Sequence, residues 1–311
     1  MDAPKPLELV FASVDGLDLT LDVFVPESAT ETSKAPVLLW WHGGGLLQGT
    51  RKGHSCHSSL RTISLPQQNI TYASSLQTTV SRTRFPGILA DCKAAMEFVR
   101  SPTFALATGN RVDSSKMVLS GSSAGGWLSL LAGTGIGYIA CGLDPPAAVS
   151  GIAALYPITD LADPFWTTKQ RPVSYFPRVI PDEEVASFLD PASSKVAYSA
   201  ADSDRAVFYH YMVQEGILEK LLLEGTDIPA SAFAVAPAIQ TGKFAVPPTY
   251  MIHGEVDDKV PCRQARDVAE ALKKIKAQFE YEELPGLNHL FDRDPKCEME
   301  NMYAFVAKVT K

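Results

Sequence analysis

The chain has 311 residues, of which 46% are hydrophobic and 20% charged, so it can bury the core of one large α/β domain or of two small ones. This balance excludes an intrinsically disordered chain. The formal net charge of −7 excludes the basic surface that nucleic-acid-binding proteins need, so we expect no nucleic acid as a partner.

Five cysteines are scattered along the chain without metal-ligand spacing: Cys56, Cys92, Cys141, Cys262 and Cys297. Their odd number and wide spacing predict free thiols in a reducing compartment rather than a disulfide framework. Residues 1–10 carry an acidic residue at position 2 and two prolines but no apolar core, so they do not resemble a signal peptide. The longest apolar run, VLLWW, is far too short to span a membrane. We therefore expect a cytoplasmic protein without a membrane span.

Hydrophobic patterning predicts strands and helices that alternate along the chain. Residues 7–26 are expected to form two strands around a turn at Asp15 and Gly16. Further strands are expected within residues 35–45, 116–120, 148–160, 247–258 and 279–285, and helices within residues 85–100, 124–133, 262–277 and 297–311. Strands that are apolar throughout belong to sheets covered on both faces. The pattern therefore predicts an α/β fold with a mostly parallel central sheet flanked by helices.

One long segment interrupts this alternation, between the strands at residues 148–160 and 247–258. Residues 161–246 are punctuated by prolines, are expected to be helical, and carry many aromatic side chains: Phe165, Trp166, Tyr175, Phe176, Phe188, Tyr198, Phe208, Tyr209 and Tyr211. These aromatics can form the core of the insertion itself, or roof an apolar pocket. We expect residues 1–160 and 247–311 to form the core domain and residues 161–246 to form a helical cap insertion.

The stretch GSSAG at residues 121–125 fits the motif G-x-S-x-G centred on Ser123. An apolar strand is expected before it and a helix after it. A nucleophile in a tight strand-to-helix turn has strained backbone angles, and side chains two residues away on either side would collide. Gly121 and Gly125 remove that collision, so Ser123 is a better candidate than Ser122. An ordinary helix start with a capping serine would have a similar sequence.

A serine nucleophile needs a base, which an acid in turn orients. Of the six histidines, His289 is the only one that follows a plausible acid in the order Ser, Asp or Glu, His. Asp257 is the preferred acid, with Asp258 as the alternative, because both follow an expected buried strand. Taken alone, an aspartate after a strand is usually a turn residue.

The sequence HGGG at residues 42–45 ends the third expected strand. Glycines there let backbone N–H groups point into a site, so Gly44 and Gly45 are candidates for an oxyanion hole together with Ala124. Ala124 lies at the start of an expected helix, where the helix dipole favours negative charge. A tight loop without such a function would also use glycines.

Together these motifs resemble the α/β-hydrolase superfamily, and within it the hormone-sensitive-lipase-like carboxylesterases that carry HGGG and GxSxG. The resemblance implies Ser123 as nucleophile, His289 as general base and acid, and Asp257 as the residue that orients it. It also implies Gly44, Gly45 and Ala124 as the oxyanion hole, with no metal or other cofactor. His42 would organise the glycine loop, and Asn288 and Leu290 flank His289 where the group usually has a glycine.

The function expected from this resemblance is hydrolysis of an ester of a medium-sized, fairly apolar small molecule through an acyl-enzyme. Amidase, lactonase and formamide hydrolase activities use the same triad and stay open. A non-hydrolytic dehydratase or cyclase, or a ligand-binding protein on the same scaffold, also stays open. The presence of His289 counts against a pure binding role. The partner expected is a small-molecule acyl substrate, and a homodimer is the one assembly left open.

Overall fold

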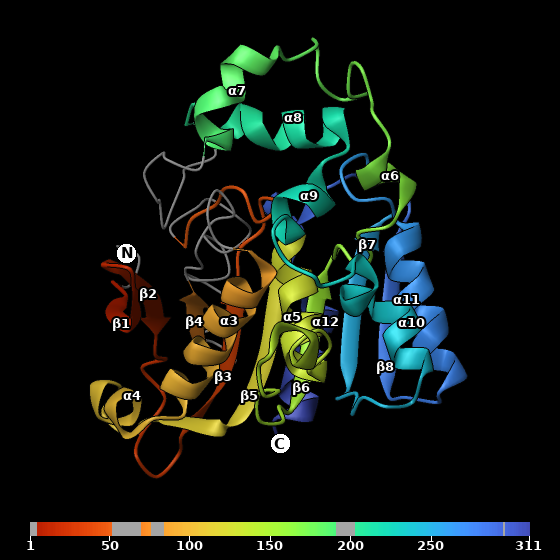
Figure 1. Cartoon of the computed structure of the whole chain (residues 1–311). Helices are drawn as coiled ribbons and strands as arrows, with labels where there is room; N and C mark the ends of the chain where they lie inside the picture. Colours follow the sequence, from red (N-terminus) through yellow and green to blue (C-terminus); the bar gives the residue numbers. More distant parts are fainter. Residues whose placement is uncertain (1–4, 52–69, 76–83, 191–202, 295) are drawn as a thin grey trace.

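The computed structural model describes residues 5–51, 70–75, 84–190, 203–294 and 296–311. Its centre is an eight-stranded sheet with the strand order β1-β2-β4-β3-β5-β6-β7-β8 (Figure 1). The strands are β1 Leu7–Val14, β2 Leu17–Phe24, β3 Ala35–Trp41, β4 Thr71–Ser75, β5 Val112–Ser122, β6 Gly151–Leu155, β7 Thr249–Gly254 and β8 Phe279–Leu284. Strands β1 and β2 pair antiparallel with each other, and β2 pairs antiparallel with β4. The six strands from β3 to β8 are parallel to one another. The expected α/β fold with a mostly parallel sheet is confirmed.

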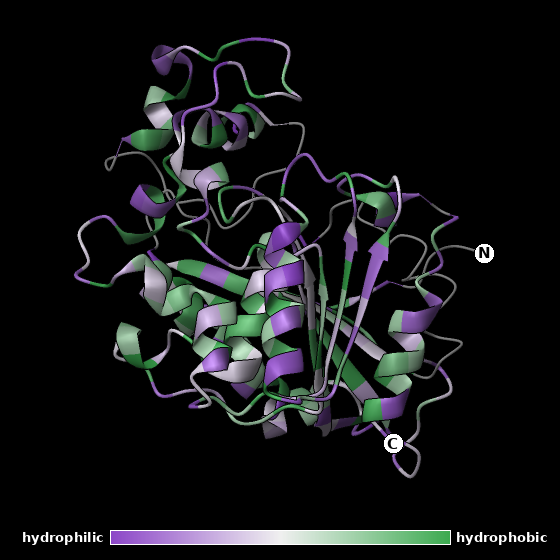
Figure 2. Cartoon of the chain, turned by 90° about the vertical axis from the view of Figure 1, so that its right-hand side faces the viewer, coloured by the Kyte–Doolittle hydropathy of each residue, from purple (hydrophilic) through white to green (hydrophobic). Residues whose placement is uncertain are grey.

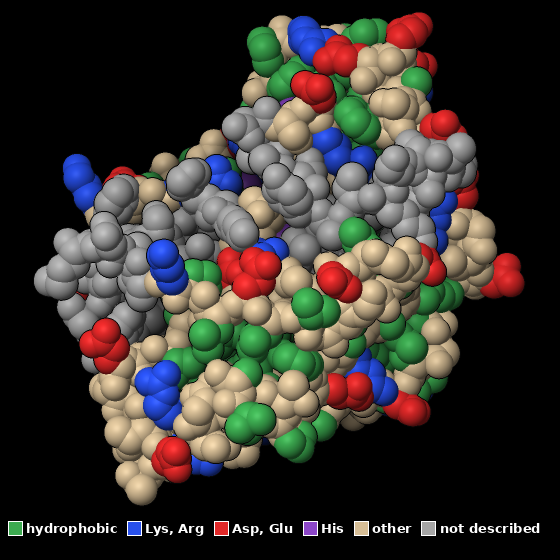
Figure 3. All heavy atoms as spheres, turned by 90° about the vertical axis from the view of Figure 1, so that its left-hand side faces the viewer, with side chains coloured by type: hydrophobic (Ala, Val, Ile, Leu, Met, Phe, Trp, Pro, Cys, Tyr) green, Lys and Arg blue, Asp and Glu red, His purple; other side chains and the backbone are tan. Residues whose placement is uncertain are grey.

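A tight hairpin joins the first two strands. Asp15 and Gly16 have φ angles of 53° and 80°, which match the positive φ at both central residues of a type I′ turn. Strand β1 lies at the edge of the sheet, where Leu7, Val10 and Val14 are exposed. On the face of the molecule that carries this edge, hydrophobic side chains gather between charged ones (Figure 3).

The expected core helices are all present, because their apolar stripes have a sheet to cover. They are α3 Phe85–Val99, α5 Ala124–Thr134, α11 Arg263–Lys274 and α12 Glu300–Val309. Two short elements were not expected, strand β4 and helix α4 (Pro102–Ala107). Strand β4 has the mostly polar sequence TYASS and is only five residues long, and it is extended because it pairs with both β2 and β3. Helix α4 has a local signal, because the Ser101 side chain accepts a hydrogen bond from the Phe104 N–H.

The sheet buries side chains on both faces, as continuous apolar strands require. Along β3, Val37, Leu39 and Trp41 belong to a core shared with α3, α5 and α11. Leu38 and Trp40 belong to a second core shared with α12. The helices turn hydrophilic residues outward over the hydrophobic strands behind them (Figure 2).

The insertion between β6 and β7 consists of short helices and loops. It contains α6 Pro164–Thr167, α7 Asp182–Leu189, α8 Ala206–Glu215, α9 Leu218–Leu223 and α10 Val235–Gln240. Helices α7 and α8 lie beyond the end of the sheet at the top of Figure 1, whereas α10 lies beside α11. Most of the expected aromatic set is described and packs in the larger core, but Tyr198 lies outside the described residues. That residues 161–246 act as a cap stays a prediction.

No helix in the described ranges is both long and apolar enough to cross a membrane. A cytoplasmic location and a homodimer stay predictions. The four described cysteines, Cys92, Cys141, Cys262 and Cys297, are free thiols, and Cys56 lies outside the described residues.

Helix α5 packs so closely on the sheet that one of its positions has no room for a side chain. A Cβ atom added to Gly125 would lie 2.0 Å from the Trp41 carbonyl oxygen at the end of β3. At Gly133, in the same helix, an added Cβ would lie 2.5 Å from Ile152 Cδ1, the end of a flexible side chain. Only the second contact can relax through a side-chain rotation, because the first is with backbone.

We predict that Gly125→Ala lowers the free energy of unfolding by at least about 2 kcal/mol, since the helix must move away from β3. The matched variant Gly133→Ala should cost less than about 1 kcal/mol, because Ile152 can rotate and alanine favours a helix. Urea denaturation of both variants measures the difference. Equal losses in the two variants would contradict the close approach at Gly125.

Candidate active site

Ser123 lies at a sharp turn between β5 and α5. Strand β5 ends at Ser122 and helix α5 begins at Ala124, and between them Ser123 has φ 56° and ψ −120°. This strained conformation is rare for a residue with a side chain. A Cβ atom added to Gly121 would lie 2.4 Å from the Gly125 backbone, so two bulkier residues could not share this turn. The turn is therefore centred on Ser123 rather than on Ser122.

Backbone contacts fix the turn from both sides. The Ser123 N–H donates to the Leu155 carbonyl at the end of β6 (2.9 Å), and its carbonyl accepts from the N–H groups of Trp127 and Ile158. Ser123 is buried, with 4% of the residue exposed. A hydroxyl held in this way on a rigid turn suits a nucleophile.

The glycine loop after β3 lies against this serine. A Cβ atom on Gly43 would come within 3.2 Å of Ser123 Cβ, and Gly44 and Gly45 have φ angles of 106° and 63°. Within the described part of the chain, the N–H groups of Gly44, Gly45 and Ala124 donate no hydrogen bond. Free N–H groups beside a serine are what an oxyanion hole requires.

His42 contacts the same loop rather than the serine. Its Nδ1–H donates to the Gly43 carbonyl at 2.8 Å. Burial lowers the pKa of His42, which keeps the ring neutral. A Cβ atom on Gly49 would lie 2.1 Å from His42 Nδ1, so the ring is enclosed by the loop that it braces.

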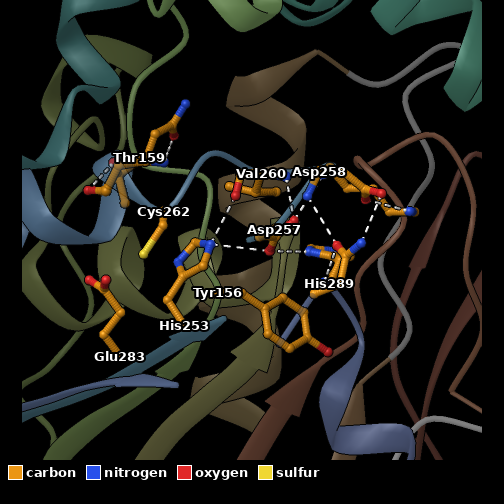
Figure 4. A network of polar contacts seen from close by, with 12 residues as sticks. Tyr156, Thr159, His253, Asp257, Asp258, Val260, Cys262, Glu283 and His289 are labelled. Carbon is orange, nitrogen blue, oxygen red and sulfur yellow. Dashed lines mark hydrogen bonds and ion pairs between the residues drawn. The ribbon is translucent and has the colours of Figure 1, made fainter. Parts of the chain in front are cut away.

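Asp257 begins a turn after β7, and its two carboxylate oxygens have different partners (Figure 4). Oδ1 accepts hydrogen bonds from the backbone N–H groups of Lys259 (2.8 Å) and Val260 (2.9 Å). Oδ2 accepts a hydrogen bond from His289 Nδ1 at 2.6 Å. The structure thus joins the expected acid and the expected histidine, and it leaves His289 Nε2 as the proton acceptor of the ring. The alternative acid, Asp258, instead pairs with Lys259 Nζ at 2.8 Å.

These contacts keep the carboxylate charged in a buried position. Burial of the Asp257 side chain would raise its pKa, but the imidazoles of His253 and His289 and the Val260 N–H outweigh this effect. The net result is a pKa well below the usual range for aspartate. A charged acid next to His289 stabilises the imidazolium that forms when His289 takes a proton.

The loop that carries His289 is tied to the loop that carries the acid. Asn288 Oδ1 accepts from the Asp258 N–H (3.0 Å) and from the His289 N–H (2.6 Å), and its Nδ2 donates to Asp258 Oδ2 (2.9 Å). Leu290 has a left-handed φ of 62°, a conformation that glycine adopts more readily. The Asn288 side chain therefore joins the two loops through hydrogen bonds, which a glycine at this position could not make.

Tyr156 is a neighbour of His289 that the sequence did not reveal. It follows β6 with φ 35°, is fully buried, and places its ring 4.4 Å from the His289 ring between centroids. Its hydroxyl donates to Asp292 Oδ1 at 2.5 Å, three residues beyond His289. Tyr156 therefore supports the histidine loop from the strand behind it.

His253 is a second histidine at the acid, and sequence order had set it aside because it precedes Asp257. Its Nε2 lies 3.1 Å from Asp257 Oδ2 and 2.9 Å from the Val260 carbonyl oxygen. The i,i+4 spacing to Asp257 was a visible signal, but spacing across a strand end does not predict contact.

Ser123 Oγ has no hydrogen-bond partner among the described residues. In particular, it makes no hydrogen bond with His289 Nε2. Hydrogen bonds between nucleophile and base are often long or unformed until substrate binds. The described chain also contains no group of three or more histidine, cysteine or acidic side chains that could hold a metal ion. The turn at Ser123 and the Asp257–His289 pair are the groups that acyl transfer by an activated serine requires.

Two family models match the chain, in two separate parts. The BD-FAE model matches residues 21–183, which include the glycine loop and the serine turn. The model of the prolyl oligopeptidase family matches residues 225–311, which include Asp257 and His289.

Curated relatives are much longer than this chain. The non-reducing polyketide synthase pkbA of Emericella nidulans is 26% identical over 91% of this chain and 13% of its own length. Methylphloroacetophenone synthase of Cladonia uncialis is 27% identical over 93% of this chain and 12% of its own length. The chain thus corresponds to a small part of each of these proteins.

Solved structures show the same fold over nearly the whole chain. Thermogutta terrifontis esterase 2 phosphonylated by sarin has a TM-score of 0.64 at 19% identity, covering 98% of this chain and 93% of that chain. The butyrate-bound form of that esterase has a TM-score of 0.64 at 20% identity, covering 99% and 94%.

The lowered pKa of Asp257 predicts a pH dependence of stability. Because the folded-state pKa lies below the unfolded value of about 3.9, ionised Asp257 stabilises the fold above that pH and this stabilisation is lost as pH falls toward the folded pKa. The difference in free energy of unfolding between wild type and Asp257→Asn should therefore be smaller below about pH 4 than at pH 7. Urea denaturation across this range measures it.

The matched control for this titration is Asp258→Asn, which changes the neighbouring, less buried carboxylate. The difference between wild type and this control should be small at all pH values, because exposed ion pairs contribute about 0–1 kcal/mol. A pH-independent difference for Asp257→Asn would contradict the lowered pKa.

Proposed function

The chain belongs to the BD-FAE family and has the α/β-hydrolase fold of serine esterases, and from this premise we propose that it cleaves an ester of a medium-sized, fairly apolar small molecule. The observation that carries the proposal is the strained turn at Ser123, which lies at the same edge of the sheet as the Asp257–His289 pair. Both follow parallel strands at their carboxyl ends, where α/β proteins bind ligands.

In the proposed mechanism, Ser123 Oγ attacks the acyl carbonyl while its proton passes to His289 Nε2. The N–H groups of Gly44, Gly45 and Ala124 receive the oxyanion of the tetrahedral intermediate. The intermediate collapses to an acyl-enzyme as His289 gives its proton to the leaving alkoxide. Water, deprotonated by His289, then attacks the acyl-enzyme and releases the acid and Ser123. Asp257 stays ionised throughout and orients the ring.

The insertion at residues 161–246 is proposed to act as the cap over this site. Three contacts support this role. A Cβ atom on Gly45 would lie 2.7 Å from the Tyr209 ring, and the Tyr209 hydroxyl donates to the Lys259 carbonyl at 3.4 Å. In addition, Arg205 Nε donates to the Leu47 carbonyl at 2.7 Å. Helix α8 and the residue before it thus touch both the glycine loop and the acid loop.

A polyketide acyl compound, bound as an ester or as a thioester, is the second candidate substrate. The similarity to a segment of the non-reducing polyketide synthase pkbA, over 91% of this chain, favours it. The same triad chemistry would cleave either bond, because the leaving thiolate needs less protonation than an alkoxide. Amidase, lactonase and formamide hydrolase activities, and a non-hydrolytic or binding role, are alternative outcomes of the experiments below.

We predict that a fluorophosphonate forms one covalent adduct, on Ser123. Intact-protein mass followed by peptide mapping locates it. The adduct should be lost in Ser123→Ala and slowed by about a thousandfold or more in His289→Ala, because the hydroxyl is a weak nucleophile without its base. Ser122→Ala is the matched control and should be labelled like wild type. An adduct on Ser122, or no adduct on the folded wild-type protein, would contradict the proposal.

A substrate panel should separate the two candidates. We expect p-nitrophenyl butyrate and hexanoate to be hydrolysed with kcat/KM at least about a hundredfold above the Ser123→Ala variant. N-acetylcysteamine thioesters of the same acids form the matched series. A clear preference for the thioesters would replace the ester proposal by the second candidate. Turnover of neither series by protein that is labelled on Ser123 would point to an amide, a lactone or a formamide.

A further inference from the structure

His253 occupies a position behind the acid that no step of the proposed mechanism uses. It lies near the end of β7 and is fully buried, with 0% of its surface exposed. Its Nε2 faces two acceptors, the Val260 carbonyl oxygen at 2.9 Å and Asp257 Oδ2 at 3.1 Å (Figure 4). Because neither acceptor can donate, Nε2 must carry a proton.

This proton links His253 to both oxygens of the acid. Val260 donates its N–H to Asp257 Oδ1 (2.9 Å), and its carbonyl accepts from His253. The same imidazole N–H lies next to Oδ2, the oxygen that His289 uses. His253 therefore binds Val260, whose N–H donates to Asp257 Oδ1, and it directly contacts Asp257 Oδ2.

We propose that His253 is a positioning residue that holds the Asp257 carboxylate with Oδ2 toward His289 and that acts on the reaction only through this acid. The inference rests on the proposed function for its effect on rate, and on geometry alone for its effect on His289. Its complete burial keeps it away from substrate, so it is no alternative base.

The shared oxygen has a consequence for the basicity of His289. An N–H next to Oδ2 offsets part of the negative charge that would otherwise act on the His289 ring. Without it, the carboxylate attracts the His289 proton more strongly, so the pKa of His289 should rise. The carboxylate is then also freer to rotate, and misorientation of a base slows proton transfer.

Replacing His253 by glutamine or by asparagine tests whether the position of the N–H donor matters, because the two side chains end in the same amide group at different distances from the backbone. The amide nitrogen of glutamine reaches the place of imidazole Nε2, whereas that of asparagine reaches the place of Nδ1. His253→Asn thus removes the donor at Asp257 and His253→Gln returns it. Tyr250→Phe is the control on the same strand, because it removes a buried hydroxyl that contacts Glu282 (2.9 Å) and not the acid.

The experiment measures the rate of inactivation by a fluorophosphonate as a function of pH, for wild type and the three variants. We expect His253→Asn to lower the plateau rate about tenfold or more and to move the acidic limb upward by about half a pH unit or more. His253→Gln should recover most of both losses, and Tyr250→Phe should follow wild type. Urea denaturation of each variant confirms that the protein is folded.

Two results would overturn the inference. One is a His253→Asn profile that matches wild type, and the other is an equal loss in the Asn and Gln variants with no movement of the limb, which indicates packing only. The pKa of His289, followed by NMR of histidine-labelled protein, needs no activity and should rise in His253→Asn. If the fluorophosphonate does not label wild type but the pKa of His289 still rises in His253→Asn, the proposed function is refuted and the positioning role remains intact.

Discussion

The contact between helix α5 and the carbonyl end of β3 is the constraint on which the rest of the site depends. Because Gly125 lies against the Trp41 carbonyl, the chain leaves β5 and enters α5 without room for an ordinary turn. Ser123 then adopts a positive φ of 56° at the turn between the two elements. The same contact brings the glycine loop that follows β3 next to the serine. Strain at one residue is thus imposed by packing that the large hydrophobic core stabilises.

The parallel strands then supply every other group at one edge of the sheet. The glycine loop follows β3, Ser123 follows β5, Tyr156 follows β6, Asp257 follows β7 and His289 follows β8. Residues far apart in sequence meet there because register and strand order fix the ends of neighbouring strands. Hydrogen bonds between loops complete the alignment, and the Asn288 side chain joins the last two of them.

The fold, the turn at Ser123 and the pairing of Asp257 with His289 could be predicted because they have signals in the sequence. Continuous apolar strands, a glycine-flanked serine, and the order of serine, acid and histidine are all visible in one chain. Strand β4 could not be predicted, because its short, mostly polar sequence TYASS becomes a strand only through pairing with its neighbours. His253 and Tyr156 were missed for a related reason: each acts across a contact between strand ends that no sequence period encodes.

Two histidines contact one acid, yet only one of them can serve as a base. His289 uses Nδ1 toward Asp257, which leaves Nε2 unprotonated, and 5% of its side chain is exposed. His253 uses Nε2 toward Val260 and Asp257, and its Nδ1 is buried without a partner among the described residues. Because protein encloses the whole ring, that nitrogen has no access to a substrate. Both histidines contact the same carboxylate oxygen, but through different ring nitrogens. His289 can therefore act as a base, whereas His253 can only support the acid.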